Sequence, residues 1–237
     1  MAISYQFSPS LITYLSLASG YKAGGFNNVG PAEYDEERSL SYELGLKGHA
    51  LKNKLSFAAA AFFTDWQNLQ ITQSISPSLS ALQNVGKATS SGLETTLALR
   101  LSSRMTFFGS ASWQTTELAK STLKNGVPVG STPLPYAPEY SFALGALFNQ
   151  PLSGRLSLYA RVDIQTLGSF QYDFQNNFTQ DAYTLANFRL GLRQNAWFVE
   201  AFTNNAFNTD YIPIASTNNV GENGAPITVG MRVGIRF

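Results

Sequence analysis

The 237-residue sequence contains no cysteine and a single histidine, His49. The absence of a thiol excludes cysteine catalysis, and a zinc site is not expected where its preferred ligands are so few. Charge is also scarce, because only 13% of residues are charged, about half the fraction of an ordinary soluble domain. The formal net charge of +1 gives no reason to expect a nucleic acid or an acidic partner.

Long apolar runs are missing too, although 44% of residues are hydrophobic and the chain has 17 Phe and 11 Tyr. No apolar run approaches the roughly 20 residues that a transmembrane helix needs. The first ten residues, MAISYQFSPS, lack the basic segment and apolar stretch of a signal peptide. Two classes remain: an all-β soluble protein, or a membrane β-barrel in which lipid-facing and interior residues alternate.

Alternation of apolar with polar or small residues dominates the sequence, and a period of two residues indicates β-strands. The pattern predicts about eleven strands, and their ranges are Ala2–Phe7, Leu11–Tyr21, Arg38–Gly48, Lys54–Trp66, Gly86–Leu101, Met105–Thr116, Tyr140–Phe148, Leu156–Thr166, Ala182–Arg193, Trp197–Asn205 and Ile227–Phe237. The final run is typical of a last barrel strand that pairs with the first and leaves no open edge in lipid. Its alternating apolar residues begin at Ile227, and those assigned to the carboxyl-terminal barrel signal are Val229, Met231, Val233, Ile235 and Phe237.

Charged side chains keep to one face of the predicted strands, except that Lys54–Trp66 is ambiguous because Ala58–Phe63 is apolar on both faces. In Arg38–Gly48, for example, Glu43 and Lys47 oppose an alternating series of Leu and Tyr, because successive side chains of a strand point to opposite sides of the sheet. We expect the charged face to line a barrel lumen, where it forms ion pairs across strands or with a plug. The predicted lumen-facing charges are Glu43, Lys47, Glu94, Arg100, Arg161, Asp163, Arg189, Arg193, Glu200, Arg232 and Arg236. They include no nucleophile with a base and an orienting group, so neither catalytic residues nor metal ligands are predicted.

Short and long connections take turns along the chain. The short ones are Ser8–Ser10, His49–Asn53, Ser102–Arg104, Asn149–Arg155 and Gln194–Ala196, and the long ones are Lys22–Glu37, Asn68–Val85, Glu117–Glu139, Leu167–Asp181 and Ala206–Pro226. Long loops at every second connection are uncommon in soluble domains, whereas outer-membrane barrels have short periplasmic turns and long extracellular loops. The predicted fold is therefore all-β, an antiparallel transmembrane β-barrel portion. A soluble β-sandwich, which also alternates, is the alternative.

Seven stretches resemble the barrel of TonB-dependent outer-membrane receptors, and they occur in the order of that family. They are YLSLASGYKAGGFN (Tyr14–Asn27), RSLSYELGLKG (Arg38–Gly48), AAAFFTDWQNLQI (Ala59–Ile71), NVGKATSSGLETTL (Asn84–Leu97), PLPYAPEYSFALG (Pro133–Gly145), NNAFNTDY (Asn204–Tyr211) and the closing ITVGMRVGIRF. The likeness is nearest to receptors of the siderophore type. A barrel of this family has 22 strands around a plugged lumen. The resemblance therefore assigns residues 1–237 to its carboxyl-terminal half, without the plug and the first barrel half.

The resemblance implies an outer-membrane receptor of a Gram-negative bacterium, surrounded by lipid and lipopolysaccharide and inserted by the barrel assembly machinery. Its implied cargo is a scarce nutrient, with a ferric siderophore as the ligand and no covalent cofactor. Energy would come through TonB, which engages amino-terminal segments outside residues 1–237. No enzymatic activity and no nucleic-acid partner are implied. Two alternatives stay open: a passive outer-membrane pore or surface anchor, and a soluble β-sheet binding module.

Candidate ligand contacts lie in two loops. Lys22 and Phe26 belong to the glycine-rich GYKAGGFN, for which the alternative is a flexible loop base at the bilayer rim. Phe170, Tyr172 and Phe174 belong to FQYDFQNNF, for which the alternative is surface variation. The KNGV sequence at 124–127 predicts a small hairpin in its loop. Aromatic residues near strand ends are interpreted as interface girdles, and they are Tyr14, Tyr42, Trp66, Trp113, Tyr140, Phe148 and Trp197.

Overall fold

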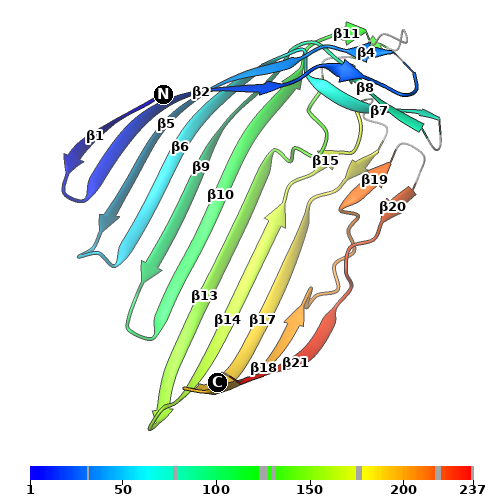
Figure 1. Ribbon diagram of the computed structural model, residues 1–237. Helices are drawn as coiled ribbons and strands as arrows, with labels where there is room; N and C mark the ends of the chain where they lie inside the picture. The colour runs from blue at the N-terminus through cyan, green and yellow to red at the C-terminus, as the bar shows by residue number, and fades with distance from the viewer. Residues whose placement is uncertain are drawn as a thin grey trace.

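The computed structural model describes residues 1–30, 32–76, 79–122, 128–129, 132–174, 178–216 and 220–235. Within these ranges, eleven long strands form one antiparallel sheet (Figure 1). Apart from the two at the edges, each long strand pairs with the long strand before it and the one after it in the sequence. The strands are β1 (Ala2–Ser8), β2 (Leu11–Lys22), β5 (Glu37–Ala50), β6 (Leu55–Gln67), β9 (Ala88–Arg100), β10 (Met105–Leu118), β13 (Tyr140–Ser153), β14 (Leu156–Leu167), β17 (Tyr183–Gln194), β18 (Trp197–Asn204) and β21 (Thr228–Ile235). The prediction of about eleven antiparallel strands is confirmed.

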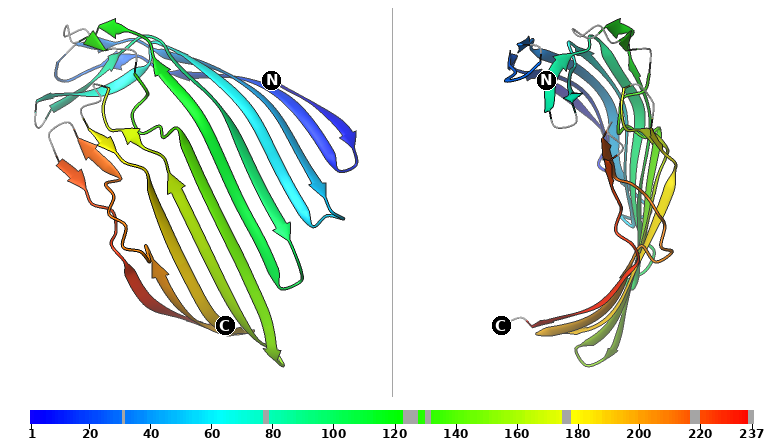
Figure 2. Two further views of the ribbon diagram at one scale, coloured as in Figure 1. Left: turned by 180° about the vertical axis from the view of Figure 1, so that it is seen from behind. Right: turned by 90° about the vertical axis from the view of Figure 1, so that its right-hand side faces the viewer.

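The sheet is a single curved layer with β1 and β21 at its two edges (Figure 2). The largest boundary error is at β13, which continues to Ser153 and pairs with β14 across a turn at Gly154 and Arg155. The shift of register beside Pro151 marks a bulge, which accommodates a residue that cannot donate to the ladder. No helix long and apolar enough to cross a membrane occurs in the described part of the chain.

The long loops gather at one end of the sheet and the short turns at the other, as predicted (Figure 1). Among the described residues, each long loop carries a two-stranded hairpin. These hairpins are β3 (Gly25–Phe26) with β4 (Glu33–Tyr34), β7 (Gln70–Ser76) with β8 (Leu79–Asn84), β11 (Ser121–Thr122) with β12 (Pro128–Val129), β15 (Phe170–Gln171) with β16 (Thr179–Gln180), and β19 (Ile214–Ser216) with β20 (Val220–Glu222). The hairpin expected around KNGV is thus confirmed, although the turn itself lies outside the described residues. The other four were not predicted.

Pairing register defines two faces of the sheet, because directly opposed residues point to the same side. Glu200 is opposite both Gly191 and Arg232, and Arg161 is opposite Arg189. We call this side the polar face. The other side, the apolar face, carries large side chains that are mostly exposed, with relative exposures of 61% for Leu44, 63% for Leu93, 61% for Leu144, 54% for Leu190 and 72% for Met231.

The main buried cluster lies among the loops rather than under the sheet, since a single layer has no second layer to enclose a core. Ile71, Val85, Ala88 and Leu118 form this loop core, and Trp66, Leu69, Leu134 and Phe174 pack against it. Two of the predicted girdle aromatics are therefore misplaced. Trp66 packs on the loop core, and Tyr14 lies on the polar face, where its hydroxyl donates to Glu43.

Candidate functional site

The first candidate pair, Lys22 and Phe26, sits where β2 enters its long loop. The Lys22 ammonium lies 3.4 Å from a carboxylate oxygen of Glu37, whose residue is only 7% exposed. The same oxygen accepts a hydrogen bond of 2.8 Å from the backbone N–H of Gln70. Phe26 is 81% exposed. The Lys22 ammonium is thus paired with Glu37 at the base of the loop, whereas the Phe26 ring is accessible to a ligand.

Side-chain amides join this loop to the β7–β8 hairpin. Asn27 donates from Nδ2 to the carbonyl of Leu82 at 2.9 Å and accepts from the N–H of Leu82 at 3.0 Å. Gln70 donates from Nε2 to the carbonyls of Ala23 and Asp35 at 3.0 and 2.9 Å. Sequence reasoning missed these contacts, because an amide in a loop does not indicate its distant partner. The network holds Phe26 beside a second loop.

The second candidate group, in FQYDFQNNF, is largely enclosed. Phe170 and Tyr172 are 7% and 9% exposed, and their rings lie 5.3 Å apart. The Tyr172 hydroxyl donates its single proton to the carbonyl of Ile212 at 2.6 Å, and Oε1 of Gln180 lies 2.9 Å from the same hydroxyl oxygen. Burial raises the pKa of Tyr172 above its ordinary value of 10.0. Phe174 instead packs against the loop core.

Tyr136, which the sequence did not single out, completes this aromatic group. Its ring lies 5.9 Å from that of Phe170 and 5.8 Å from that of Tyr172, and its hydroxyl donates to the carbonyl of Ala215 at 2.7 Å. Its backbone has φ of +57°, a left-handed conformation that is uncommon for a bulky side chain. Phe170, Tyr172 and Tyr136 thus join three loops, and the buried rings of Phe170 and Tyr172 are placed to hold loops more than to touch a ligand.

The polar face carries aromatic rings packed over glycines. Tyr14 lies opposite Gly45, and the same arrangement joins Phe108 to Gly145, Tyr159 to Gly191 and Phe202 to Gly230. A cation lies over each of these four rings, with distances to the ring centroid of 5.0 Å for Lys47, 5.1 Å for Arg161, 5.6 Å for Arg193 and 5.0 Å for Arg232. Cation–π attraction stabilises such pairs. Four of the predicted charges therefore have aromatic partners that their sequence pattern did not indicate.

Carboxylates of the polar face have distinct partners. Arg161 donates to both oxygens of Asp163 at 2.6 Å, a bidentate pair along one strand. Glu43 accepts from Tyr14 at 2.6 Å, and Glu200 lies 3.6 Å from Arg232 across two strands. Of the other predicted charges, Glu94, Arg100 and Arg189 share this face by register, and Arg236 lies outside the described residues. In the described ranges no group of three or more His, Cys, Asp or Glu side chains is placed to hold a metal ion.

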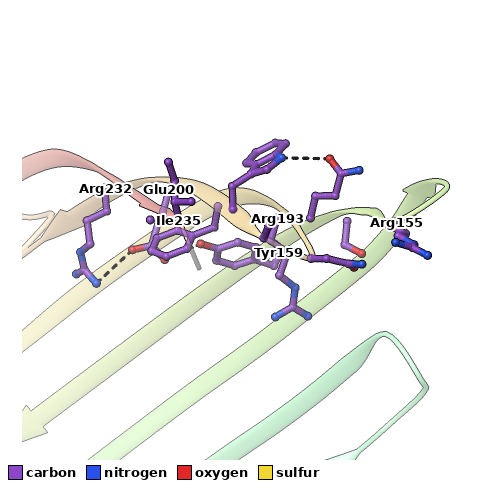
Figure 3. A pocket seen from close by; sticks show the side chains of 13 residues that line it. Arg155, Tyr159, Arg193, Glu200, Arg232 and Ile235 are labelled. Carbon is purple, nitrogen blue, oxygen red and sulfur yellow. Dashed lines mark hydrogen bonds and ion pairs between the residues drawn. The ribbon is translucent and has the colours of Figure 1, made fainter. Parts of the chain in front are cut away.

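A cavity of about 800 Å³ opens on the polar face at the turn end of β14, β17, β18 and β21 (Figure 3). Its lining includes Arg155, Tyr159, Arg193, Glu200 and Arg232. The sequence predicted the face of three of these side chains, Arg193, Glu200 and Arg232, and it did not indicate that they surround one space. These side chains come together only through the pairing of four strands, which no single segment of the sequence indicates.

Known proteins resemble the chain over nearly its full length. The sequence profile described as "TonB dependent receptor-like, beta-barrel" matches residues 1–208. The pesticin receptor of Yersinia pestis is 25% identical over 244 aligned residues, which cover 99% of this chain and 34% of that receptor. The catecholate siderophore receptor Fiu of Escherichia coli K12 is 28% identical over 205 residues, covering 84% of this chain and 25% of that receptor.

Solved structures show the same fold. The crystal structure of the ferric yersiniabactin uptake receptor FyuA from Yersinia pestis matches with a TM-score of 0.83 and 21% identity, over 100% of this chain and 36% of that one. The ferric-catecholate import receptor Fiu from Escherichia coli K12, in its closed form, matches with a TM-score of 0.75 and 22% identity, over 100% and 34%. The chain thus spans about a third or less of the length of these relatives. It belongs to the family of TonB-dependent receptor β-barrels, which are outer-membrane proteins of Gram-negative bacteria.

Proposed function

We propose that the chain forms the carboxyl-terminal half of the barrel of a receptor that takes up a ferric siderophore. The long loops at the outer end bind the cargo, and the strands form the wall. The observation that carries this proposal is the loop layer itself, which has its own buried core and hydrogen-bond network on top of a sheet whose apolar face is exposed. The names of the relatives, a catecholate siderophore receptor and a ferric yersiniabactin uptake receptor, support the cargo class.

The exposed apolar face meets the hydrocarbon of the outer membrane in this proposal, and the polar face lines the lumen. Leucines that are more than half exposed on a sheet surface need an apolar surrounding, and lipid supplies it. Lipopolysaccharide covers the outer rim, and the barrel assembly machinery inserts the strands. TonB acts through amino-terminal segments outside residues 1–237, and the chain itself has no enzymatic role.

A self-closing pore fits the strand topology less well. Because neighbours in the sheet are antiparallel and the described strands number eleven, β1 and β21 run in the same direction. A barrel closed by pairing these edges would contain a parallel pair, whereas bacterial single-chain barrels have an even number of antiparallel strands. A defined channel from the isolated chain in planar bilayers would favour the pore.

Ligand binding by the chain, refolded in detergent, tests the proposal. A ferric catecholate and a ferric phenolate are titrated against intrinsic tryptophan fluorescence, with ferric citrate as the control. We expect saturable quenching by at least one ferric siderophore and a weaker response after Phe26→Ala, because Phe26 is the accessible ring among the candidate contacts. Equal responses to all three iron complexes, or none, would contradict siderophore recognition by these loops.

A further inference from the structure

Two neighbouring turns at the end of the sheet opposite the long loops carry cations and no acidic residue. They connect β5 to β6 and β9 to β10, and the backbone N–H of Arg100 donates to the carbonyl of Lys54 at 2.7 Å where the two hairpins meet. Residues 44–64 and 95–116, which include both turns, contain no Asp or Glu, and their cations are Lys47, Lys52, Lys54, Arg100 and Arg104. None of the ion pairs within the described ranges involves these five residues.

Each of the two turns also exposes a leucine near its cations. Leu51 is 64% exposed and directly precedes Lys52, and Leu101 is 54% exposed and lies in the same turn as Arg104. Leu51 and Lys52 have φ of +53° and +57°, a left-handed conformation that such residues seldom adopt. Gly or Asn would form this turn with less strain, so turn geometry does not account for Leu and Lys here. Leucines next to cations are typical of a protein surface that lies at an anionic membrane interface.

The four strands that these turns connect also line a groove on the apolar face, with a volume of about 560 Å³. Ala59 lies opposite Thr95, which lies opposite Ala111, so three small side chains are adjacent across β6, β9 and β10. The Thr95 hydroxyl donates to the carbonyl of Ala58 at 3.1 Å and needs no partner from an occupant. Larger side chains also line the groove, and they are Leu44, Leu46, Leu93, Trp113 and Phe142. The groove therefore suits a hydrocarbon chain.

The groove and the cations are spaced like the two parts of a lipid molecule. Ala59 lies five residues after Lys54, and Thr95 lies five residues before Arg100, which corresponds to about 17 Å along a strand. For a strand tilted by about 45° this is about 12 Å of depth, within the roughly 15 Å of hydrocarbon in one leaflet. The groove thus lies in the leaflet whose headgroups are level with the two turns.

We propose that the two turns and the groove bind an anionic phospholipid of the periplasmic leaflet. Its phosphate would lie among Lys52, Lys54 and Arg104, which are exposed, and one acyl chain would lie along Ala59 and Thr95. A zwitterionic lipid brings an ammonium group that these cations repel, and a free phosphate leaves the groove empty. The inference rests on the proposed function in taking the apolar face as lipid-facing and the turns as periplasmic.

Lipids with brominated acyl chains, which quench tryptophan on contact, test this proposal on the full chain refolded in an uncharged detergent. Brominated phosphatidylglycerol and brominated phosphatidylcholine are titrated separately. The part of the quenching that Trp113→Phe removes reports the groove, because Trp113 lines it and is 55% exposed. We expect phosphatidylglycerol to reach half of this quenching at a mole fraction about fivefold lower than phosphatidylcholine does.

Two double variants of equal charge separate the turns from the rest of the chain. Lys52→Gln with Lys54→Gln should reduce the preference for phosphatidylglycerol to less than about twofold. Lys87→Gln with Lys120→Gln removes the same charge from exposed lysines at the loop end and should leave the preference unchanged. Ala59→Leu fills the groove and should weaken the Trp113-dependent quenching by both lipids.

Four results would overturn the proposal: both lipids quench alike, Trp113→Phe removes no quenching, the variant at Lys87 and Lys120 loses the preference equally, or soluble glycerol phosphate competes as well as the lipid. The last would indicate a simple anion site. If the variant at Lys52 and Lys54 does not fold, salt provides the test on the wild-type chain. About 0.5 M sodium chloride should remove most of the preference because it screens exposed charges, and a preference insensitive to salt would contradict the proposal. No siderophore is present in this assay, so failure of the cargo proposal and failure of this one are distinguishable.

Discussion

The hydroxyl of Tyr172 donates a 2.6 Å hydrogen bond to the carbonyl oxygen of Ile212, a residue 40 positions away in the sequence. This contact joins the loop before β17 to the loop between β18 and β21. Tyr172 is buried and packs against the rings of Tyr136 and Phe170. The bond therefore sets how the two loops lie over the end of the sheet.

Replacing Tyr172 by Phe removes this part-buried bond and leaves the carbonyl of Ile212 without its donor. We expect the segment around Ile212 to open more readily by about 1–3 kcal/mol, while the eleven-stranded sheet stays folded. Hydrogen exchange and limited proteolysis of the refolded chain measure this opening. Tyr21→Phe, at a 66% exposed ring, makes the same chemical change and should have no effect; equal protection in Tyr172→Phe and wild type would contradict the role of Tyr172.

The contact between Tyr172 and Ile212 should also weaken at alkaline pH. Burial raises the pKa of Tyr172 above its ordinary value of 10.0. A group whose pKa is raised on folding contributes its full stability below the unfolded value, and this contribution is lost as the pH rises through the folded value. Proteolysis near Ile212 is thus expected to be constant between pH 7 and 9 and to accelerate above about pH 10. Tyr172→Phe should remove that acceleration, whereas its persistence would assign the effect to another group.

The side-chain amide of Asn27 joins the loop between β2 and β5 to the β7–β8 hairpin. Because Asn27 both donates to and accepts from the backbone of Leu82, Asn27→Asp loses the donor and brings a negative charge to a carbonyl oxygen. We expect the β7–β8 hairpin to lose about 1–2 kcal/mol of protection against hydrogen exchange. Asn28→Asp makes the same change at an exposed neighbouring residue and is the matched control. If both variants exchange alike, the amide pair does not hold the hairpin.

Much of the sheet could be predicted from sequence because a strand's period of two is a local property. Leu40, Tyr42, Leu44 and Leu46 alternate with polar neighbours whatever their partners are, so the strand and its two faces follow from one segment. The end of β13 was missed because Pro151 indicates a break, and only pairing with β14 shows that a bulge absorbs it. The local pattern therefore predicts which segments form strands more accurately than it predicts where those strands end.

The loop contacts could not be predicted, since they depend on residues far apart in the sequence. Phe170, Tyr172 and Phe174 suggested accessible aromatics, but the first two are enclosed by Tyr136 and by a segment near Ile212. Burial of this kind follows from how three loops meet. The same limit applies to the cavity around Glu200, because its lining residues come together only through the pairing of four strands.

Ring-over-glycine contacts should be sensitive to a single methyl group. At Gly45 an added Cβ would collide with the Tyr14 ring, which is also held by Glu43 and lies beneath Lys47. Gly45→Ala is expected to destabilise the chain by about 1–3 kcal/mol, measured by urea unfolding in detergent. Combining it with Tyr14→Leu should give a smaller loss than the sum of the two single variants. Strict additivity would show that ring and glycine do not interact.

Which face of the sheet meets lipid can be tested by placing an arginine at two depths along the apolar face. Leu44 lies near the middle of β5 and is 61% exposed on the apolar face, so Leu44→Arg should cost about 2–4 kcal/mol if this face meets lipid at mid-bilayer. Leu99 lies near the turn end of β9, opposite Leu55. Leu99→Arg should therefore cost only about 0–1 kcal/mol, as at the membrane interface.

The control for this pair is Ser16→Arg, which places the same side chain on the polar face, opposite Glu43. All three variants are compared by heat-modifiable migration and by urea unfolding in lipid vesicles. We expect Leu44→Arg to assemble poorly and Ser16→Arg to behave as wild type, because the latter charge meets a carboxylate in place of hydrocarbon. Normal assembly of Leu44→Arg together with failure of Ser16→Arg would reverse the two faces, and with them the lumen in which the arginine-lined cavity is placed.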